Sequence, residues 1–475
     1  MKILQITCLL FFYSHLVAQE LGVSIATWKN NAQGAYSIIH DDFGDYSVDG
    51  VWKYADTIAH NRGITFTIGA ITSSCENERK INNYNNPYEY AKMVMIEQHG
   101  HELINHTHTH TCALSISWCN TGDGWADLKD YSQEIDKSTT SIFENTGYKP
   151  QFFIYPFDQF SNGANDYLKK LGYIGSRSGW SSKQENSESY HRSGYDTYDE
   201  NSFFPDDDGF FRSAVVIGVN ADGEAGELNE NAQLAIDKGV WVNRELHNVG
   251  DVGWGHVPID TYRSHLDFLQ SKMNSGELWI ATVSEILTYQ IQKLNYTVRA
   301  DYEEVDYYAT VSFEKKDFDI STYLAPLYFK SPMTVNLDLS TYSERDNIEV
   351  YQGGMQIFEF TKSKEGLAIN IYPSNGDLVI KNIGGTTTSL AVNSINQNEV
   401  LVYPNPSKYM FHLDFGPHNN TNISKIEIYD RLNHLIETVH IESIEEGFGE
   451  GLSSGIYFLR FITPLGDFTK KVVKI

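Results

Sequence analysis

Five of the 16 histidines of this chain lie between His99 and His110. Neutral imidazoles at such short spacing suit a divalent metal ion, and two local structures would bring them together. A strand would place His106, His108 and His110 on one face, whereas a helical turn would pair His106 with His110 at i, i+4. In either case one carboxylate would complete a set of three ligands and leave positions open for water and substrate.

Two adjacent carboxylates, Asp41 and Asp42, are the candidates for that third ligand. They follow an apolar run at residues 35–40, which predicts a buried strand. Catalytic groups of parallel barrels gather at the C-terminal ends of strands, so we expect this pair to face a site there. Adjacent carboxylates can divide the work, because one binds the metal while the other stays free as a base.

The elements that must position these residues alternate along the chain from about residue 35 to residue 289. Alternating strands and helices predict an α/β fold with a parallel sheet, and over roughly 250 residues a closed or distorted (β/α) barrel is favoured. Polar sequence rich in Tyr and Asp between residues 180 and 230 is interpreted as an excursion over one face. The predicted strands are 35–40, 64–68, 102–104, 152–154, 173–174, 240–246 and 278–281, and the predicted helices are 52–59, 88–97, 128–146 and 165–171.

After residue 289 the helical period disappears, and short strand-like runs follow one another with turn residues between them. This spacing predicts an antiparallel β-sandwich over residues 291–396, which we interpret as a spacer or accessory domain. A break near residue 396 precedes a last all-β unit over residues 399–475. The strands predicted in the sandwich are 296–300, 308–313, 333–339, 348–351, 367–371 and 378–380.

The composition is that of an acidic protein of 475 residues, 41% hydrophobic, with a formal net charge of −26. The hydrophobic content is enough for real cores and excludes a disordered chain. The negative charge repels phosphate backbones and anionic membranes, so we expect no nucleic-acid partner. We also expect no transmembrane segment, because no run beyond the N-terminal residues is long and apolar enough to cross a bilayer.

Residues 1–18 have the pattern of a cleaved signal peptide. Lys2 provides a positive start, residues 3–12 are largely apolar, and Leu16-Val17-Ala18 offers a small-residue exit. The apolar run is too short for a membrane anchor. The sequence therefore predicts an exported protein.

The cysteines indicate at most one disulfide bond in the exported chain. Cys75, Cys112 and Cys119 remain after removal of the signal, and an odd count leaves one spare thiol in an oxidising compartment. Cys112 and Cys119 would close a short loop and are the predicted pair. No CxxC spacing occurs, which argues against a thiolate zinc site or a thioredoxin-type redox centre.

Two strings around the chemical candidates resemble motifs of one enzyme family. HDDFG at residues 40–44 and GHELINHTHTH at residues 100–110 resemble the first and second motifs of the polysaccharide deacetylase (NodB-homology) family, carbohydrate esterase family four. The resemblance covers about residues 25–290. It implies that Asp41 is the general base and that His108 falls at a variable position between ligands. The ligands that it implies for zinc or a similar divalent ion are Asp42, His106 and His110.

A third string, FIYPF from residue 153, resembles the motif whose Pro–aromatic pair lines the substrate groove and whose backbone N–H holds the oxyanion. The family commonly has an Arg three residues before the aromatic residue, beside the base, and this chain has Ile154 there. Arg177, at the end of the next predicted strand, is the candidate replacement. The groove residues implied by the resemblance are Tyr155, Pro156 and Phe157.

The fifth motif of the family resembles ELH at residues 245–247, which implies that His247 is the general acid. The glycine-rich loop that follows adds Asp251 and Trp254 as candidate site-lining residues, and His256 is a rival acid. The acidic fourth motif has no clear counterpart, because the acidic run at residues 206–208 lies in the irregular excursion.

The C-terminal unit resembles the sorting domain of the type IX secretion system. The strings that carry this resemblance are VYPNP from residue 402, GIYFL from residue 455 and KKVVKI at the C-terminus. It implies that the protein passes through the periplasm, crosses the outer membrane with the type IX machinery, and has this domain removed or anchored. We therefore expect a secreted or cell-surface protein.

Together these features predict a secreted, metal-dependent hydrolase that removes N- or O-acetyl groups from a carbohydrate polymer. Two alternatives stay open. Related families hydrolyse C–N bonds of small amides or cyclic ureides, although the two β-domains and the export address argue against a metabolic role. Ile154 in place of the Arg also leaves room for a catalytically silent carbohydrate-binding protein.

Overall fold

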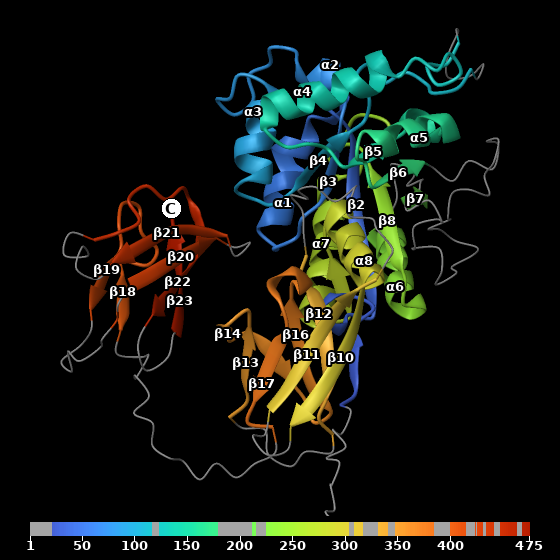
Figure 1. Ribbon diagram of the computed structural model, residues 1–475. Helices are drawn as coiled ribbons and strands as arrows, with labels where there is room; N and C mark the ends of the chain where they lie inside the picture. The colour runs from blue at the N-terminus through green and yellow to red at the C-terminus, as the bar shows by residue number, and fades with distance from the viewer. Residues whose placement is uncertain are drawn as a thin grey trace, which may run out of the picture.

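A computed structural model of the chain describes thirteen stretches of the sequence. They are residues 21–115, 123–178, 211–214, 225–303, 308–316, 331–340, 347–383, 400–414, 423, 425–430, 434–440, 447–462 and 468–475. Figure 1 shows an N-terminal α/β unit, a middle unit of sheets and a C-terminal unit of strands.

The central sheet is parallel in every pairing, in the order β7-β6-β5-β4-β3-β2-β8. β9 pairs with the start of β2, whereas β3 pairs with its end. The prediction of a distorted (β/α) barrel is confirmed. Its strands are β2 (Gly34–Phe43), β3 (Thr67–Ala70), β4 (Glu102–Asn105), β5 (Phe152–Ile154), β6 (Gly175–Ser178), β7 (Phe211–Ala214), β8 (Trp241–Leu246) and β9 (Leu278–Ile280).

Helices surround this sheet, as Figure 1 shows; most connect one parallel strand to the next, and α8 leads from β9 to β10 (Tyr296–Glu303) of the middle unit. Most begin within a few residues of their predicted starts, but the helix predicted from residue 128 begins at Ser132. The helices are η3 (Val51–Ala55), α1 (Asp56–His60), α2 (Thr72–Cys75), α3 (Pro87–Tyr90), η4 (Ala91–Ile96), η5 (Ser132–Asp136), α4 (Lys137–Thr146), α5 (Asn162–Lys170), α6 (Ala225–Lys238), α7 (Ile259–Asn274) and α8 (Val283–Asn295), with the short turns η1 (Lys29–Asn31), η2 (Tyr46–Val48) and η6 (Pro156–Asp158).

β3 begins three residues after its predicted start, at Thr67, and β6 differs from its prediction for a physical reason. The apolar pair Tyr173-Ile174 predicted a strand, but β6 begins one residue later, at Gly175, and carries the sequence GSRS. All four of its residues are buried although three are polar. Apolar patterns mark strands that face an apolar core, whereas this strand contributes to a polar, charged edge.

Part of the interpreted excursion belongs to the barrel. Within residues 180–230 the structure places β7 at the edge of the sheet and the first turns of α6. The acidic run at residues 206–208 lies outside the described residues.

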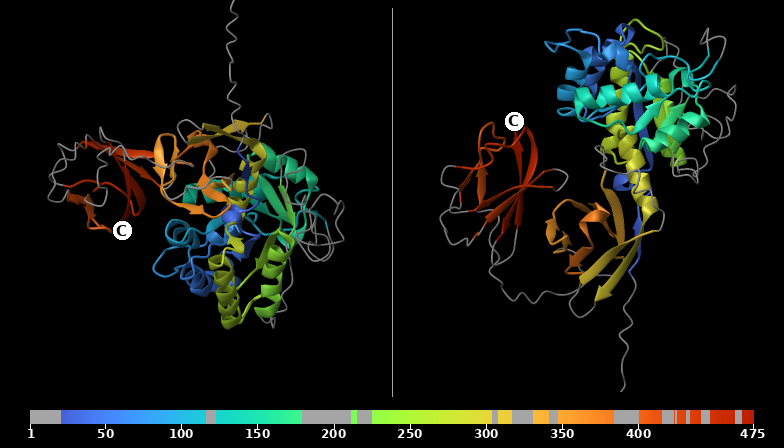
Figure 2. Two further views of the ribbon diagram at one scale, coloured as in Figure 1. Left: turned by 90° about the horizontal axis from the view of Figure 1, so that it is seen from below. Right: turned by 45° about the horizontal axis from the view of Figure 1, so that its top comes forward.

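The middle unit consists of two antiparallel sheets. One has the order β1-β12-β16-β15 and the other β10-β11-β17-β13-β14. Residues that precede the barrel contribute β1, which pairs with β12 (Figure 2). The strands are β1 (Val23–Ile25), β10 (Tyr296–Glu303), β11 (Tyr308–Lys315), β12 (Met333–Asp338), β13 (Glu349–Gln352), β14 (Met355–Ile357), β15 (Phe360–Lys362), β16 (Gly366–Ile371) and β17 (Leu378–Lys381), with the turn η9 (Pro373–Asn375).

The barrel and the middle unit share one continuous apolar core. The Tyr289 hydroxyl of α8 donates a hydrogen bond of 2.9 Å to the carbonyl of Ala26, which leads out of β1. The Ala26 N–H in turn donates to the carbonyl of Thr334 on β12 at 2.9 Å. The N-terminal segment thus connects the barrel to the middle unit.

The C-terminal unit has a four-stranded sheet, β21-β20-β22-β23, and the pair β18-β19, with an apolar core of its own. Its strands are β18 (Leu401–Tyr403), β19 (His412–Asp414), β20 (Lys425–Asp430), β21 (Leu435–His440), β22 (Gly455–Ile462) and β23 (Phe468–Lys474). Within the described parts of the chain, no helix combines the length and apolar character that a membrane span requires.

The cysteines of the barrel differ in state. Cys112 is disulfide-bonded, and its predicted partner Cys119 lies outside the described residues. Cys75 is a buried free thiol whose Sγ donates to the carbonyl of Phe43 at 3.4 Å. Burial raises the pKa of this thiol and keeps it protonated.

Buried neutral histidines make the barrel sensitive to acid. Burial, followed by the charge of Arg244, lowers the pKa of His265 from 6.5 to about 3. Between these two values the unfolded chain binds one more proton than the folded chain, so stability is lost as the pH falls from 6.5. We expect His265→Gln to reduce the pH slope of the unfolding free energy between pH 6 and pH 4 by about 1.4 kcal/mol per pH unit.

Denaturant unfolding at several pH values measures this slope. His434→Gln is the matched control, because the His434 side chain is 69% exposed. An unchanged slope in His265→Gln would show that this imidazole titrates equally in both states.

Candidate active site

The chemical candidates converge at one edge of the sheet because they end parallel strands. Asp41 and Asp42 are at the end of β2, and His106 follows β4 directly. Phe157 follows β5, and His247 follows β8. The residues of these loops surround a cavity of about 360 Å³, lined by Asp41, Asp42, His106, His110, Tyr155, Phe157, Asp158, Glu245, His247 and Trp254.

Neighbouring residues of a regular strand point to opposite faces, yet Asp41 and Asp42 both line this cavity. The backbone explains the difference. The register between β2 and β3 shifts between His40 and Phe43, and Asp42 has a left-handed φ of 63°. A β-bulge of this kind redirects a side chain, and the strained conformation of a non-glycine residue is typical of a functional position.

Asp42, His106 and His110 form a compact group of possible metal ligands. Asp42 Oδ1 lies 3.2 Å from His106 Nε2 and 3.1 Å from His110 Nε2. This oxygen is buried and, within the described residues, has no hydrogen bond of acceptable geometry. His106 Nδ1 donates to the carbonyl of Ile154 at 3.1 Å, so its Nε2 lone pair faces Asp42. These donors fit a divalent cation.

Electrostatics support the same group. Burial alone would raise the pKa of Asp42, but His106 and His110 outweigh it and hold this pKa well below its usual value. A second group, Asp41, Glu245 and His247, also has its ligand atoms close together. The Arg177 guanidinium already occupies the space between its two carboxylates, and a metal cation there would be repelled.

The loop that carries His106 and His110 is neither strand nor helix. Left-handed φ values at Thr107 (66°) and His110 (59°) turn the chain back, so that the two imidazole rings lie 4.8 Å apart. The Glu134 carboxylate accepts the backbone N–H groups of His108 and Thr109 at 3.1 and 2.9 Å. A side-chain carboxylate from a neighbouring helix, accepting backbone N–H groups of the loop, thus fixes the loop.

The other histidines of the cluster have different roles. His108 Nδ1 lies 2.8 Å from the Thr72 hydroxyl and outside the ligand group. His99 and His101 both contact the buried Asp56 carboxylate, at 2.6 and 3.1 Å. His101 Nδ1 accepts the backbone N–H of Phe66, so its other nitrogen must carry the proton and donate to Asp56. That tautomer cannot bind a metal through the nitrogen facing Asp56.

Arg177 is buried and contacts three carboxylates. Its guanidinium donates to Asp41 Oδ2, to Asp158 Oδ1 at 2.9 Å and to Glu245 Oε2 at 2.9 Å. Arg177 stands opposite Ile154 in the register of β5 and β6. The cation therefore reaches Asp41 from the strand next to the one that carries Ile154.

Asp41 is held at one of its two carboxylate oxygens. Oδ2 accepts from Arg177, whereas Oδ1 is buried without a hydrogen-bond partner among the described residues. A carboxylate fixed in this way can accept a proton from a water molecule in the cavity.

One cation among three carboxylates leaves this cluster short of positive charge. Burial raises the pKa of Glu245 well above its usual value, with Arg177 opposing the shift and Asp158 adding to it. Burial also raises the pKa of Asp158, again against Arg177. Protons are therefore held on Glu245 and Asp158 more readily than on an ordinary surface carboxylate.

His247 also lines the cavity, close to the ligand group. Its Nε2 is 3.7 Å from Asp42 Oδ2, and the Trp254 ring packs edge-on against the imidazole at 4.6 Å. The His40 Nδ1–H donates to the backbone carbonyl of His247 at 2.9 Å and fixes its main chain. Burial lowers the pKa of His247, although Asp42 acts in the opposite direction.

Aromatic side chains form the rim. Trp254 is 69% exposed and Phe157 is 42% exposed, and the Phe157 ring lies 4.8 Å from that of His110. Tyr155 lines the cavity, but its hydroxyl donates to Asn165 Oδ1 at 2.9 Å in the interior. Pro156 is buried and outside the cavity lining.

The two remaining candidates of the glycine-rich loop do not line the cavity. Asp251 is exposed, and His256 Nδ1 donates to the carbonyl of Gly253 at 2.9 Å. His256 is therefore not positioned to replace His247 as the general acid.

Sequence reasoning missed two carboxylates, Asp158 and Glu245. Asp158 comes directly after the Pro–aromatic pair and looks like a turn residue. Glu245 belongs to the ELH string with His247. The alternation of side chains along a strand predicts which face Glu245 is on, but it does not predict a charged partner for it. Only the shared contact with Arg177 reveals both.

Comparison with known families agrees with this geometry. Residues 38–175 match the family model described as polysaccharide deacetylase. The chain contains a polysaccharide deacetylase domain. Residues 401–475 match the model described as a secretion system C-terminal sorting domain. No curated protein sequence matches the chain significantly.

Solved structures similar to the deacetylase domain include a family 4 acetyl xylan esterase from Clostridium thermocellum in complex with a cobalt ion. It is 13% identical, with a TM-score of 0.33, and the match covers 54% of this chain and 90% of the esterase. The Bc1960 peptidoglycan N-acetylglucosamine deacetylase is 11% identical, with a TM-score of 0.33 and coverages of 54% and 88%. A CE4 family pseudoenzyme from Bacillus anthracis is 13% identical, with a TM-score of 0.32 and coverages of 54% and 66%. These likenesses are too distant to assign an activity.

Metal binding distinguishes the two adjacent carboxylates of the deacetylase domain. We expect Asp42→Ala to weaken zinc binding by more than ~100-fold, beyond the effect typical of a group that only supports a ligand. Asp41→Asn should retain nearly full metal content, because Asp41 is held by Arg177, lies 3.9 Å from His106 Nε2 and is outside the ligand group.

Metal content after equilibrium dialysis against zinc measures this difference. His108→Gln is the control, since His108 lies in the same loop but outside the ligand group. Equal metal loss in the Asp41 and Asp42 variants would contradict the division of roles.

Arg177 should act on turnover more than on substrate binding. We expect Arg177→Ala to lower kcat by roughly 10²–10⁴-fold, the range for impaired acid–base catalysis, with a much smaller change in KM. Arg263→Ala, which removes a half-exposed arginine paired with Asp260, is the control. Steady-state kinetics together with a thermal melt would test this, and an unchanged kcat in a folded Arg177→Ala protein would rule it out.

Proposed function

We propose that this protein is an exported, metal-dependent deacetylase that hydrolyses N- or O-acetyl groups on a carbohydrate polymer. The observation that carries the proposal is the pairing of a metal-ligand group with a held carboxylate in one cavity. Asp42 Oδ1 faces His106 and His110 at 3.2 and 3.1 Å, and Asp41 beside it is fixed by Arg177.

Asp42, His106 and His110 would hold the divalent ion, and the two imidazoles with one carboxylate suit zinc. When bound, such an ion supplies Lewis acidity to the acetyl carbonyl and makes water more acidic. The site keeps open positions for both, because three protein ligands converge there among the residues that the structure describes.

The residues around the ligands would then move protons and hold charge. Asp41, which lines the cavity and is held by Arg177, takes a proton from the attacking water. The backbone N–H of Phe157 helps to hold the oxyanion that forms on the acetyl carbonyl. His247 donates a proton to the leaving amine or sugar hydroxyl, which an amide needs more than an ester does.

The aromatic rim supports a sugar substrate. Phe157 and Trp254 both line the cavity and present exposed rings, suited to the apolar faces of sugar rings. Tyr155 and Pro156 precede Phe157 in the chain, and the hydrogen bond from the Tyr155 hydroxyl to Asn165 anchors the start of this turn.

The geometry of Arg177 weakens the case for a catalytically silent carbohydrate-binding protein. This silent alternative arose because Ile154 cannot hydrogen-bond, which would leave the base without a partner. Arg177 supplies that partner from β6, so the base has the contact that the sequence motif lacked.

The sorting domain extends the proposal to location. Residues 1–18 would act as a signal peptide, and residues 399–475 would direct the chain through the type IX secretion machinery to the cell surface or beyond. An acetylated polysaccharide outside the cell would be the substrate.

Acetate release tests the activity. We expect the zinc-loaded protein to release acetate from acetylated xylan or from chitin oligomers, to stop with a chelator and to recover with added zinc. Asp41→Asn should be inactive with metal bound. Release that persists with the chelator would contradict metal dependence, and a metal-loaded protein that binds these glycans without releasing acetate would establish the silent alternative.

A further inference from the structure

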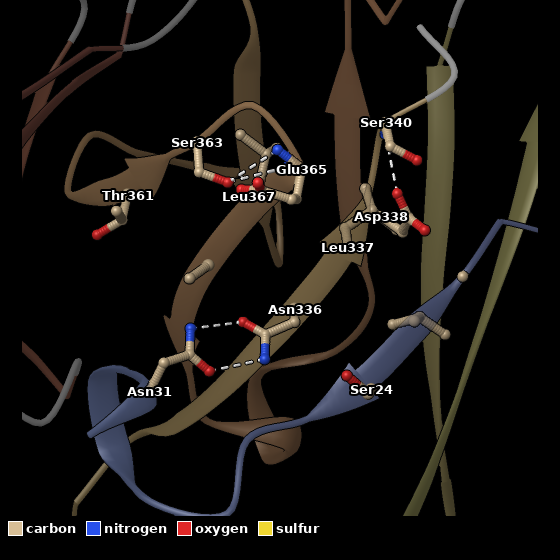
Figure 3. Close-up of a pocket in the computed structure, with 14 residues that line it drawn as sticks. Ser24, Asn31, Asn336, Leu337, Asp338, Ser340, Thr361, Ser363, Glu365 and Leu367 are labelled. Carbon is tan, nitrogen blue, oxygen red and sulfur yellow. Dashed lines mark hydrogen bonds between the residues drawn. The ribbon is translucent and has the colours of Figure 1, made fainter. Parts of the chain in front are cut away.

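A second hollow lies on the middle unit, at the end of the barrel where the parallel strands begin. It is a groove of about 620 Å³ over the outer face of the sheet β1-β12-β16-β15 (Figure 3). Asn31, which lines it, stands three residues before the start of β2. The active site lies at the opposite end of the same strands, so the groove is a separate site.

Strand register makes the floor of this groove a continuous row. Ser24 pairs with Asn336, Asn336 with Ala368, and Ala368 with Thr361, across all four strands. The residues on either side of this row along β12, Val335 and Leu337, are buried in the core. The exposed face therefore carries hydroxyl and amide groups around one small side chain.

The amides of the groove are oriented in advance. Asn31 and Asn336 exchange two hydrogen bonds of 2.8 Å, visible in Figure 3. Each amide has two N–H groups and two oxygen lone pairs, so each retains a donor and an acceptor beyond this pair. Groups that are fixed before binding lose less freedom when a ligand arrives.

The lining selects a class of ligand. Its fourteen residues include no Lys, Arg, His or aromatic residue, and the only charges are the carboxylates of Asp338 and Glu365. Anionic polymers would be repelled, and the Trp, Tyr and Arg side chains that dominate protein interfaces are missing from this lining. Amides and hydroxyls instead match sugar hydroxyls, which both donate and accept.

We propose that this groove binds an uncharged segment of the polysaccharide on which the deacetylase domain acts, a proposal that rests on the function proposed above. The groove is joined firmly to the barrel, because the Asn30 N–H donates to Thr334 Oγ1 at 2.8 Å and Tyr289 is bonded to Ala26. A polymer held there is kept at a high effective concentration near the active site.

Two substitutions alter the groove and leave the active-site residues unchanged. Ala368→Ile fills the floor with a residue that suits a strand, and Asn31→Ala removes one exposed amide. Thr310→Ile, on β11 of the other sheet between the buried Ala309 and Val311, is the matched control.

Co-sedimentation of full-length protein with insoluble acetylated xylan and with chitin measures binding. In an Asp41→Asn background, which prevents turnover, we expect Ala368→Ile and Asn31→Ala to weaken retention by about tenfold or more, and Thr310→Ile to leave it unchanged. With Asp41 intact, the groove variants should release acetate from short soluble oligomers at the wild-type rate.

The outcomes separate this proposal from the proposed function. Groove-dependent retention without acetate release in any variant would support the groove and reject the deacetylase activity. Retention that is equal in all variants, or absent in the parent protein on both polymers, would overturn the groove proposal whatever the activity.

Discussion

A single buried cation organises the site on which the rest of this structure depends. Arg177 contacts three carboxylates that come from β2, β8 and the turn after β5. Removing such a charge from water is costly unless it is paired, and one partner would not suffice to satisfy a guanidinium. The three contacts therefore compensate its burial and, at the same time, fix the orientation of Asp41.

Strained backbone conformations also help to position the residues of the site. Left-handed φ values occur at Asp42, His110, Phe157 and Asp158, all of which line the cavity. Such conformations cost of order 1–3 kcal/mol each and persist only where the surroundings enforce them. The parallel sheet and the Glu134 carboxylate, which accepts the backbone N–H groups of His108 and Thr109, provide that enforcement.

The middle unit is an integral part of the molecule and not a loosely attached spacer. Its sheet includes β1, from residues that precede the barrel, and its core is continuous with that of the barrel. The chain leaves this sheet after β1, forms the barrel and returns to the sheet at β12. The two units are therefore connected at both ends of the barrel sequence. A ligand bound to one is held at a fixed place relative to the other.

The sequence alone determined the alternation of strands and helices, the antiparallel units after residue 289, and the two families matched by residues 38–175 and 401–475. Local patterns carry this information, because apolar periodicity indicates which residues are buried and closely spaced motif residues indicate a family. The tertiary structure decided which carboxylates meet Arg177, that a bulge turns Asp41 and Asp42 to one side, and that Ser24 and Asn31 join a distant sheet. These contacts join residues far apart in the chain, and no local periodicity records which strands become neighbours.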